Sequence, residues 1–542
     1  MKGDDEMKRI IFSSLVVLAL IPFSLGIFLS PSSLAQEWAI RGKLQGTLKV
    51  VDLFMPSTSV QMNYSDSLVG LDKDNNWVPG LAEDWRWLND RTIEFKLRRG
   101  VTFHNGEKFN AEAVRVNWEE YRKMGNPMRF KGYMLPDETL LEAIDEYTVR
   151  FTLPEPYGIA FVKFWHFRQF APLFFAEHMF DEMNWGFLPE PGPWGIGPFR
   201  LVEGGVHYAK PSDLVILEAY EGYWDRRYPK IKRAIFDNRL IGDRKEAMRL
   251  CKETEGSVDI VSFIRPLDTL KVAMSKFARV VKSRDVTYLR IIFNLRKKDS
   301  KWRDIRLRKA LNYAVNRKEL WKYAAKGNAY NLAGLIPPGA YGHNPDLNLY
   351  TYDTTKARAL LAEAGYPDGF EVKIITLEAW KLETQIMKRM LERIGLKVKF
   401  YVLTTPEFFR KIYNPLLDKP AEEQEWDLHV FSLHDFYGHP GFSFLPWNYI
   451  EETNIRWIEY DPVYEDMWKD MIRTVDRESQ EGKIRQMVRY LYENAYALFI
   501  YSPLTLYAAN KEVDFVPFKC GWLNLKETSV TDNHWSIRTE KK

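Results

Sequence analysis

Cysteine and histidine are scarce in this chain. Its 542 residues include only two cysteines, Cys251 and Cys520, and nine histidines. Neither cysteine directly follows an N-terminal apolar run, which excludes the lipid-anchored cysteine of a bacterial lipoprotein, and no C-x-x-C pair is present. The two cysteines are far apart in the sequence, and they can pair if the protein resides in an oxidising compartment.

Motifs for nucleotide chemistry and hydrolysis are also missing. The sequence has no G-x-x-x-x-G-K-[ST] loop, no G-x-S-x-G elbow and no H-E-x-x-H helix. Acidic residues are plentiful, but no pair stands out as a general acid and base. We therefore expect a protein that is not an enzyme and needs no cofactor. A secreted hydrolase is the alternative from another class, because a glycosidase can place its two carboxylates in any fold.

An excess of positive charge is absent as well. The chain has 77 basic and 73 acidic residues, a formal net charge of +4, and no long run of Lys and Arg. This balance argues against a nucleic-acid partner. With 46% hydrophobic and 28% charged residues, the composition is that of a soluble globular protein, and its length predicts two or three domains. Aromatic residues reach 15%, which fits either bulky core filling or rings that line a ligand site.

The N-terminus carries the first strong positive signal. A basic pair precedes the apolar run "IIFSSLVVLALIPFSLGIFL", and the small-residue stretch "SPSSLA" then ends at Ala35. This order predicts a secretory signal peptide over residues 1–35, with translation starting at Met1 or, because the first residues are acidic, at Met7. The mature chain is then expected in the periplasm. An uncleaved membrane anchor is the alternative, since the run is long enough to span a bilayer.

Hydrophobic periodicity predicts a mixed α/β protein. The segment "RTIEFKLRRG" alternates apolar and polar residues as a strand does, and Asn110 can cap a helix that starts at Ala111. Farther along, "DIRLRKALNYAVNRKELWKYAAKG" shows helical spacing up to Gly327, which predicts a single helix there. Strands and helices continue to alternate toward the C-terminus.

Several blocks of the chain resemble a known family. The stretch "GLAEDWRWLNDRTIEFKLRRGVTFHNGEKFNAEAV" closely resembles the signature of bacterial extracellular solute-binding proteins of family 5, the peptide- and nickel-type class that feeds ABC transporters. The blocks "GIGPFRL", "YEGYWDRRYPKIKR", "FNLRKKDSKWRDIRLRKALNYAVNRKEL", "IPPGAYG" and "YDTTKARALLAEAGYPDGF" follow in the family's order. Asn110 and Ala113 stand where the family usually has Thr and Asp, and Asn316 where it has Asp; all three look like capping or helix-surface positions.

The resemblance implies a two-lobed periplasmic-binding-protein fold of type II, similar to cluster C, with an extra subdomain. It also implies that the ligand lies between two lobes that close about two hinge strands. We assign the discontinuous domain I to residues 36–66, 195–287 and 504–542, domain II to 67–194 and domain III to 288–503. Both cysteines then fall in domain I, so we expect a Cys251–Cys520 disulfide, with two buried free thiols as the alternative.

The segment "LHVFSLHDFYGHPGFSFLPWNY" is the part of the chain that bears most on the ligand. In peptide-binding relatives, an Asp of the matching segment holds the peptide's ammonium group. Here Phe436 stands in that column, Asp435 lies one residue away, and His439 replaces the Asp that usually precedes the proline. A shift of the loop by one residue would let Asp435 serve, because a buried ammonium needs a counter-charge.

Two other ligand classes remain open. An oligosaccharide would stack on rings such as Trp380, Phe442 and Trp447, as in some family members. Nickel or a nickel chelate would use imidazole. However, His429, His434 and His439 are spaced by five residues, which points them in different directions on a strand or a helix. We therefore predict no metal site.

The resemblance also gives a set of candidate ligand contacts and partners. The expected partners are a small solute and the permease and ATPase subunits of an ABC importer, with the binding protein itself a monomer. The candidate contacts are His434, Asp435, Phe436, Tyr437, His439, Trp447, Trp380, Tyr64 and Asn294.

Overall fold

The computed structural model describes most of the chain after the N-terminal segment. The described residues are 43–54, 56–123, 135–136, 138–177, 190–206, 212–408, 421–435, 438–447 and 457–540. They belong to the second of two compact units, which span residues 1–40 and 41–542. The signal peptide predicted over residues 1–35 lies outside the described residues. None of the helices in the described part has the length and apolar character that a membrane crossing requires.

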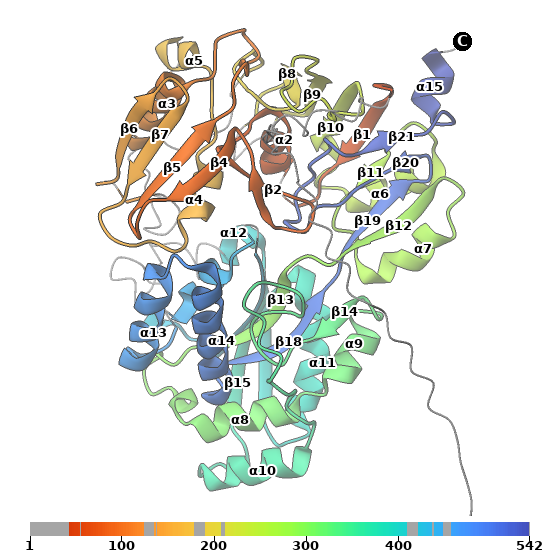
Figure 1. The fold of residues 1–542 in the computed structure, drawn as a ribbon. Coiled ribbons are helices and arrows are strands. Elements are labelled where there is room, and N and C mark those ends of the chain that lie inside the picture. The colour runs from red at the N-terminus through yellow and green to blue at the C-terminus, as the bar shows by residue number, and fades with distance from the viewer. Residues whose placement is uncertain are drawn as a thin grey trace, which may run out of the picture. The chain divides into compact units, whose positions relative to one another are not determined.

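The largest sheet has seven strands drawn from distant parts of the chain (Figure 1). In spatial order, these strands are β12 (Ala278–Ser283), β19 (Thr505–Asn510), β11 (Ile260–Val261), β1 (Thr47–Val51), β10 (Arg233–Asp237), β9 (Leu214–Ala219) and β8 (Phe199–Glu203). Strand β1 pairs in parallel with both β10 and β11, whereas the remaining pairs are antiparallel. A sheet that mixes both senses, covered by helices, confirms the α/β prediction.

A second sheet of six strands is built from residues 287 to 503. In spatial order, its strands are β14 (Ala329–Asn331), β18 (Ala497–Pro503), β13 (Thr287–Phe293), β17 (Leu428–His434), β15 (Glu371–Leu377) and β16 (Lys397–Leu403). The chain passes between the two large sheets twice, from β12 to β13 through residues 284–286 and from β18 to β19 through residue 504. We call these two short connections the crossing segments.

A third sheet has four antiparallel strands and lies within residues 82 to 152. Its strands are β4 (Ala82–Trp87), β5 (Thr92–Leu97), β7 (Thr148–Thr152) and β6 (Leu140–Asp145). Two small hairpin-like pairs complete the strands, β2 (Val69–Leu71) with β3 (Trp77–Pro79), and β20 (Val513–Asp514) with β21 (Ser529–Val530).

Helices cover these sheets. The α-helices are α2 (Pro56–Tyr64), α3 (Ala111–Lys123), α4 (Ala160–His166), α5 (Pro172–Glu177), α6 (Arg244–Glu253), α7 (Thr269–Ala273), α8 (Ile305–Ala314), α9 (Arg317–Tyr323), α10 (Thr354–Glu363), α11 (Lys381–Glu392), α12 (Thr405–Phe408), α13 (Pro462–Arg473), α14 (Arg477–Glu493) and α15 (Trp535–Glu540). Short 3₁₀ turns are η1 (Asn238–Leu240), η2 (Pro266–Asp268), η3 (Lys301–Arg303), η4 (Glu378–Trp380), η6 (Ala421–Glu423) and η7 (Pro440–Trp447).

Aromatic residues fill much of the core. Trp302 and Trp457 are almost completely buried in the hydrophobic cluster that covers the six-stranded sheet. Trp165 stacks on Trp522 with ring centroids 5.1 Å apart and an interplanar angle of 8°. A large part of the aromatic content therefore serves packing, because each such ring buries a large apolar area.

The single helix predicted up to Gly327 is wrong in one respect. The structure has two helices there, α8 and α9, because Val315 leaves the helical conformation with φ −90° and ψ 114°. Asn316 then caps α9, since its side chain accepts a hydrogen bond from the Glu319 N–H. The cap restarts the helix in a new direction, and helical spacing alone does not reveal such a break. By contrast, the Asn110 cap of α3 is confirmed by its hydrogen bond from Ala113 N–H.

Removing the cap at Asn316 should have a modest cost. The Asn316→Ala variant leaves the Glu319 N–H without its side-chain acceptor, so we expect the free energy of unfolding to fall by about 1 kcal/mol. Denaturant unfolding of the variant beside Lys318→Ala, an exposed change in the same turn, measures this. Equal stability of the two variants would show that the cap contributes nothing.

The expected Cys251–Cys520 disulfide is also wrong. Both cysteines are free thiols and both are buried. Cys251 packs against α6 and β19 neighbours in one hydrophobic cluster, whereas Cys520 belongs to the cluster of the four-stranded sheet. The prediction rested on both cysteines belonging to domain I, which does not fix the distance between them. A disulfide needs Cβ atoms that are close and correctly oriented.

Candidate functional site

Three rings from distant segments meet where the chain passes between the two large sheets. His434 ends β17 in the six-stranded sheet, and its ring centroid lies 4.9 Å from that of Phe54 and 5.5 Å from that of Phe263. Phe54 and Phe263 follow strands β1 and β11 of the seven-stranded sheet and stack on each other at 4.3 Å. We call Phe54, Phe263 and His434 the junction cluster. Sequence reasoning named His434 but missed both phenylalanines.

Strand direction explains why these residues converge. Strands β1 and β11 are parallel neighbours, so the loops that follow them leave the same edge of the seven-stranded sheet. Strands β15 and β17 are also parallel, which puts His434 and the segment leading to Trp380 at one edge of the six-stranded sheet. Ligands of open α/β sheets bind outside the carboxyl ends of such strands. The topology therefore marks this junction as the candidate ligand site.

The loop that carries Phe54 is fixed by hydrogen bonds. The Leu53 N–H donates to Ser262 Oγ at 2.9 Å, and the Ser262 hydroxyl donates to Asp52 Oδ1 at 2.6 Å. Phe54 itself keeps 38% of its surface exposed, which is unusual for a large apolar side chain. The loop therefore holds an exposed ring in a defined position, which is a property of a recognition surface.

The backbone of Phe263 is strained. Its φ of +50° lies in the left-handed region, where a bulky side chain is uncommon. The Arg244 guanidinium donates a hydrogen bond to the Phe263 carbonyl and so helps to hold this conformation. Strain of this kind concentrates at functional sites. It persists only where the surrounding structure holds the residue firmly in place.

His434 is held in its neutral form. Its Nδ1 is hydrogen-bonded to Thr287 Oγ1 at 2.6 Å, across the antiparallel pair of β17 and β13. Burial among its neighbours lowers the pKa of the imidazole well below its ordinary value. The ring thus presents an uncharged, partly exposed face to the junction near neutral pH.

His429 and His439 occupy different environments from His434. His429 lies in the core, with Trp426 and Trp457 centroids at 5.2 and 5.8 Å, and burial lowers its pKa to about 3. His439 accepts the Gly441 N–H at Nδ1 and bonds Gln480 Oε1 through Nε2, so neither nitrogen remains for a ligand.

The five-residue spacing therefore sends the three rings to three places, as its geometry predicts. Within the described residues, no three His, Cys, Asp or Glu side chains come together as metal ligands.

Asp435 is held in place by hydrogen bonds beside the junction cluster. Its backbone N–H donates to the Val286 carbonyl at 2.7 Å, and its Oδ1 accepts the His439 N–H at 3.1 Å. Gly438, with φ +64°, fits directly against the Asn75 backbone, where a Cβ would come within 2.4 Å of the carbonyl oxygen. Asp435 and Gly438 are thus each fixed against residues of another segment.

Three more candidates belong to the same segment. Phe436 and Tyr437 lie outside the described residues. Trp447 is the last residue of η7, and its side chain also lies outside the described part of the structure.

Two other candidates lie away from the junction. Tyr64 is fully buried in the core of the seven-stranded sheet. Asn294 follows the far end of β13, seven residues from Thr287, so it lies about 20 Å from His434 along the strand. The structure therefore does not bring Asn294 together with His434, and its contact with a ligand stays a prediction. Trp380 lies at the same edge of the six-stranded sheet as His434, at the N-terminus of α11.

A surface pocket of about 260 Å³ lies at that far edge, and it is not the candidate site. Its lining residues are Lys297, Lys298, Asp299, Lys301, Trp302, Phe370, Glu371, Lys373 and Asp427. Several of these charges already pair within the chain, for example Lys297 with Asp427 at 2.8 Å. Surface ion pairs of this type contribute little energy and identify no ligand.

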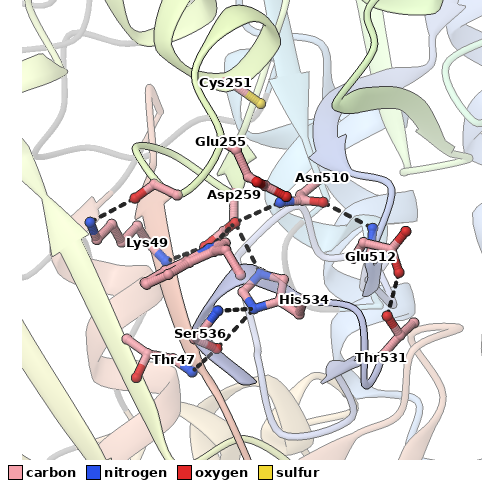
Figure 2. Close-up of polar contacts among 12 residues, drawn as sticks. Thr47, Lys49, Cys251, Glu255, Asp259, Asn510, Glu512, Thr531, His534 and Ser536 are labelled. Atoms are coloured by element: carbon pink, nitrogen blue, oxygen red, sulfur yellow. Dashed lines mark hydrogen bonds and ion pairs between the residues drawn. The ribbon is translucent and has the colours of Figure 1, made fainter. Parts of the chain in front are cut away.

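One buried constellation has the residue types of a catalytic triad (Figure 2). Ser536 Oγ lies 2.9 Å from His534 Nδ1, and His534 Nε2 lies 3.1 Å from Asp259 Oδ1. All three side chains are nearly or fully buried. Ser536 Oγ also accepts the Thr47 N–H at 3.0 Å, which engages the hydroxyl in the fold. A nucleophile must be reachable by substrate and close to oxyanion donors, so this constellation is structural.

The same carboxylate ties several segments together. Besides His534, Asp259 accepts hydrogen bonds from Lys49 N–H at 2.9 Å, from Asn510 Nδ2 at 2.9 Å and from Trp535 Nε1 at 2.9 Å. These donors belong to β1, β19 and α15. We call Asp259 and its donors the Asp259 network, which fastens the C-terminal helix to the seven-stranded sheet.

Comparison with known proteins places the chain among binding proteins. Residues 76–454 match the family described as "Bacterial extracellular solute-binding proteins, family 5 Middle". The chain is 27% identical over 361 residues to the dipeptide-binding protein of Escherichia coli K12, a match that covers 62% of this chain and 65% of that protein. It is 30% identical over 358 residues to a glutathione-binding protein of Salmonella choleraesuis, covering 63% and 64%. The matches thus span just under two thirds of each relative.

A solved structure supports the fold independently. The structure of NikA from Brucella suis in complex with Fe(III)-EDTA superposes with a TM-score of 0.74, covering 90% of this chain and all of that one, at 18% sequence identity. At this identity the likeness establishes the fold, which is the type II periplasmic-binding-protein fold expected from the sequence.

Proposed function

The chain belongs to the bacterial extracellular solute-binding proteins of family 5, and we propose that it captures a peptide-class solute for an ABC importer. In this proposal, the protein works in the periplasm as a monomer and delivers its ligand to a membrane permease driven by an ATPase. It catalyses no reaction and holds no resident cofactor. The names of the relatives, which bind a dipeptide and glutathione, support the ligand class.

The observation that carries this proposal is the junction cluster. Phe54 and Phe263 extend from one large sheet and His434 from the other, and they meet beside the crossing segments. A solute bound there contacts both sheets at once, so its binding energy differs between an open and a closed arrangement. Such a difference is what allows a ligand to shift a two-state equilibrium.

The domain assignment fits the same proposal. We propose that residues 36–66, 195–287 and 504–542 form domain I, residues 67–194 domain II and residues 288–503 domain III. Every strand of the seven-stranded sheet falls in the first set and every strand of the four-stranded sheet in the second. The six-stranded sheet begins at Thr287, within one residue of the proposed boundary. The crossing segments then act as the two hinges.

Ligand screening tests the proposal. Thermal unfolding is followed with Ala-Ala, Ala-Ala-Ala, cellotetraose and nickel–histidine, and mass spectrometry checks whether each compound survives the incubation. We expect a peptide to raise the midpoint temperature and to be recovered intact, because a ligand that binds only the native state stabilises it. If only cellotetraose or only nickel–histidine stabilises the protein, the proposed ligand class changes from peptide to oligosaccharide or to nickel chelate. Steady conversion of a compound to product would contradict the proposal and favour the hydrolase.

Phe54 should matter for affinity and little for stability. We expect Phe54→Ala to weaken binding of the stabilising peptide about tenfold, because the loss of a stacking ring costs about 1 kcal/mol or more. Isothermal titration calorimetry measures the dissociation constants. The matched control is Leu270→Ala. Leu270 is also an exposed apolar residue, and it lies in helix α7, away from the junction cluster. If Phe54→Ala binds as tightly as Leu270→Ala, the ring has no part in recognition.

A further inference from the structure

Asp285 is a buried carboxylate in the first crossing segment. Only 3% of its surface is exposed. Its Oδ1 accepts a hydrogen bond from the Ser283 hydroxyl, whereas its Oδ2 is buried and has no hydrogen-bond partner among the described residues. A buried carboxylate oxygen without a donor is costly, because the group has lost its hydration and gained nothing in return. An oxygen in this state can accept a hydrogen bond from a group outside the described residues.

The unpartnered oxygen, Asp285 Oδ2, lies beside the junction cluster. It faces the position that a side chain at Gly521 would occupy. A Cβ placed on Gly521 would lie 3.4 Å from Asp285 Oδ2, 3.6 Å from the Phe263 ring and 3.7 Å from His434 Nδ1. Gly521 has φ +81°, a conformation that other residues rarely adopt. The glycine therefore lets three segments converge, and it leaves the carboxylate next to the Phe263 ring, on which Phe54 stacks.

In the part of the chain that the structure describes, Asp285 has no cationic neighbour that neutralises it. Among the described residues, no Lys or Arg forms an ion pair with it. Lys519 contributes attraction from a distance, but its Nζ lies 2.8 Å from Asp74. Burial keeps the nearby His434 imidazole neutral and raises the pKa of the Cys520 thiol to about 12. The hydroxyl of Tyr507, also nearby, is buried and uncharged.

We propose that Asp285 receives a cationic group of the ligand, an ammonium or a guanidinium, with the Phe54 and Phe263 rings packed against it. A carboxylate supplies the counter-charge, and aromatic faces attract cations through their quadrupoles. This inference rests on the proposed function and specifies the chemistry of its ligand. Burial raises the pKa of Asp285 to about 7, which fits a carboxylate that gains its counter-charge only when the ligand arrives.

Asp435, the candidate from the sequence, is less suited to this role. Its Oδ1 already accepts the His439 N–H. Asp285 comes instead from the crossing segment, which changes conformation if the two sheets move relative to each other. A cation bound at Asp285 would therefore couple capture of the ligand directly to the hinge.

Paired probes test the inference. We measure binding of Ala-Ala-Ala and of its N-acetylated form, and the effect of tetramethylammonium chloride on thermal unfolding relative to sodium chloride at equal ionic strength. For the wild-type protein, we expect the free peptide to bind at least about tenfold more tightly than the acetylated one. Tetramethylammonium should raise the midpoint temperature. Asp285→Asn should abolish both effects, whereas Asp346→Asn, an exposed change, should leave both intact.

Gly521→Ala provides a second variant that keeps the charge. Its methyl group would occupy the position beside Asp285 Oδ2, so we expect it to remove the preference for the free peptide as well. The inference is overturned if the wild-type protein does not distinguish the cations from their neutral or inorganic counterparts, or if Asp285→Asn and Gly521→Ala both retain the wild-type preference. Stabilisation by cellotetraose without any cation effect would overturn this inference and uphold solute capture. Stabilisation by no probe would contradict both.

Discussion

Replacing Asp259 with alanine is expected to lower the free energy of unfolding by about 3 to 5 kcal/mol, because it removes the acceptor at the centre of a buried network. The backbone N–H of Lys49 and the side chains of Asn510 and Trp535 would each lose a hydrogen bond. These groups are too enclosed to recover full hydration, so each retains much of its desolvation cost.

Denaturant unfolding of Asp259→Ala should be compared with Asp346→Ala, whose carboxylate is 74% exposed. Surface substitutions of this kind usually change stability by less than about 0.5 kcal/mol. We expect the early loss of the C-terminal helix α15 in Asp259→Ala, which faster amide exchange of that helix would report. A stability loss no larger than that of the control would show that the Asp259 network is not what holds the C-terminal segment.

The stability of Asp285→Asn should depend on pH in a specific direction. Burial raises the pKa of Asp285 to about 7 in the folded protein, opposed in part by the hydrogen bond from Ser283 and by the neighbouring Thr505 hydroxyl, whereas an unfolded aspartate titrates near 3.8. Between these values, the folded state binds more protons than the unfolded state. The contribution of Asp285 to the free energy of unfolding therefore falls as pH rises from about 4 to about 7 and stays low above that.

Asparagine keeps the acceptor for Ser283 and cannot ionise. At about pH 4 the wild-type protein and Asp285→Asn should be nearly equally stable, and at pH 8 the variant should be more stable by about 1 to 4 kcal/mol. Denaturant unfolding at the two pH values, with Asp346→Asn as the control, measures this difference. A difference between wild type and variant that does not change with pH would contradict the assignment of a buried, unpaired carboxylate.

Local signals in the sequence predicted the local structure well. Asn110 and Asn316 both cap helices, as their positions in the family blocks indicated. The histidine spacing correctly predicted that the three rings point to different places, because the direction of side chains on a strand follows from spacing alone. The break between α8 and α9 escaped prediction, since it depends on one cap inside an otherwise helical pattern.

The composition of the candidate site could not be predicted in the same way. Phe54, Phe263 and Asp285 lie in three short connections without any motif, and they meet only because strands from distant segments pair in one sheet. The family segment around His434 pointed to the edge of the six-stranded sheet where the junction cluster lies, but it could not show what the other sheet contributes. Contacts between loops depend on tertiary arrangement, which local periodicity does not encode.

The free thiols illustrate the same limit. Cys251 and Cys520 fall in one proposed domain, yet they pack in separate hydrophobic clusters. Burial raises the pKa of both thiols to about 12, so neither is a reactive thiolate near neutral pH.

Amide hydrogen exchange with and without a stabilising ligand tests the central claim most directly. The claim is that solute binds at the junction cluster, between segments of the two large sheets. We predict that the ligand slows exchange in residues 52–54 and 262–265 of one sheet and in residues 284–287 and 434–435 around the other. Protection confined to one sheet, or centred on the pocket around Lys297 and Phe370 at the far edge, would contradict the account.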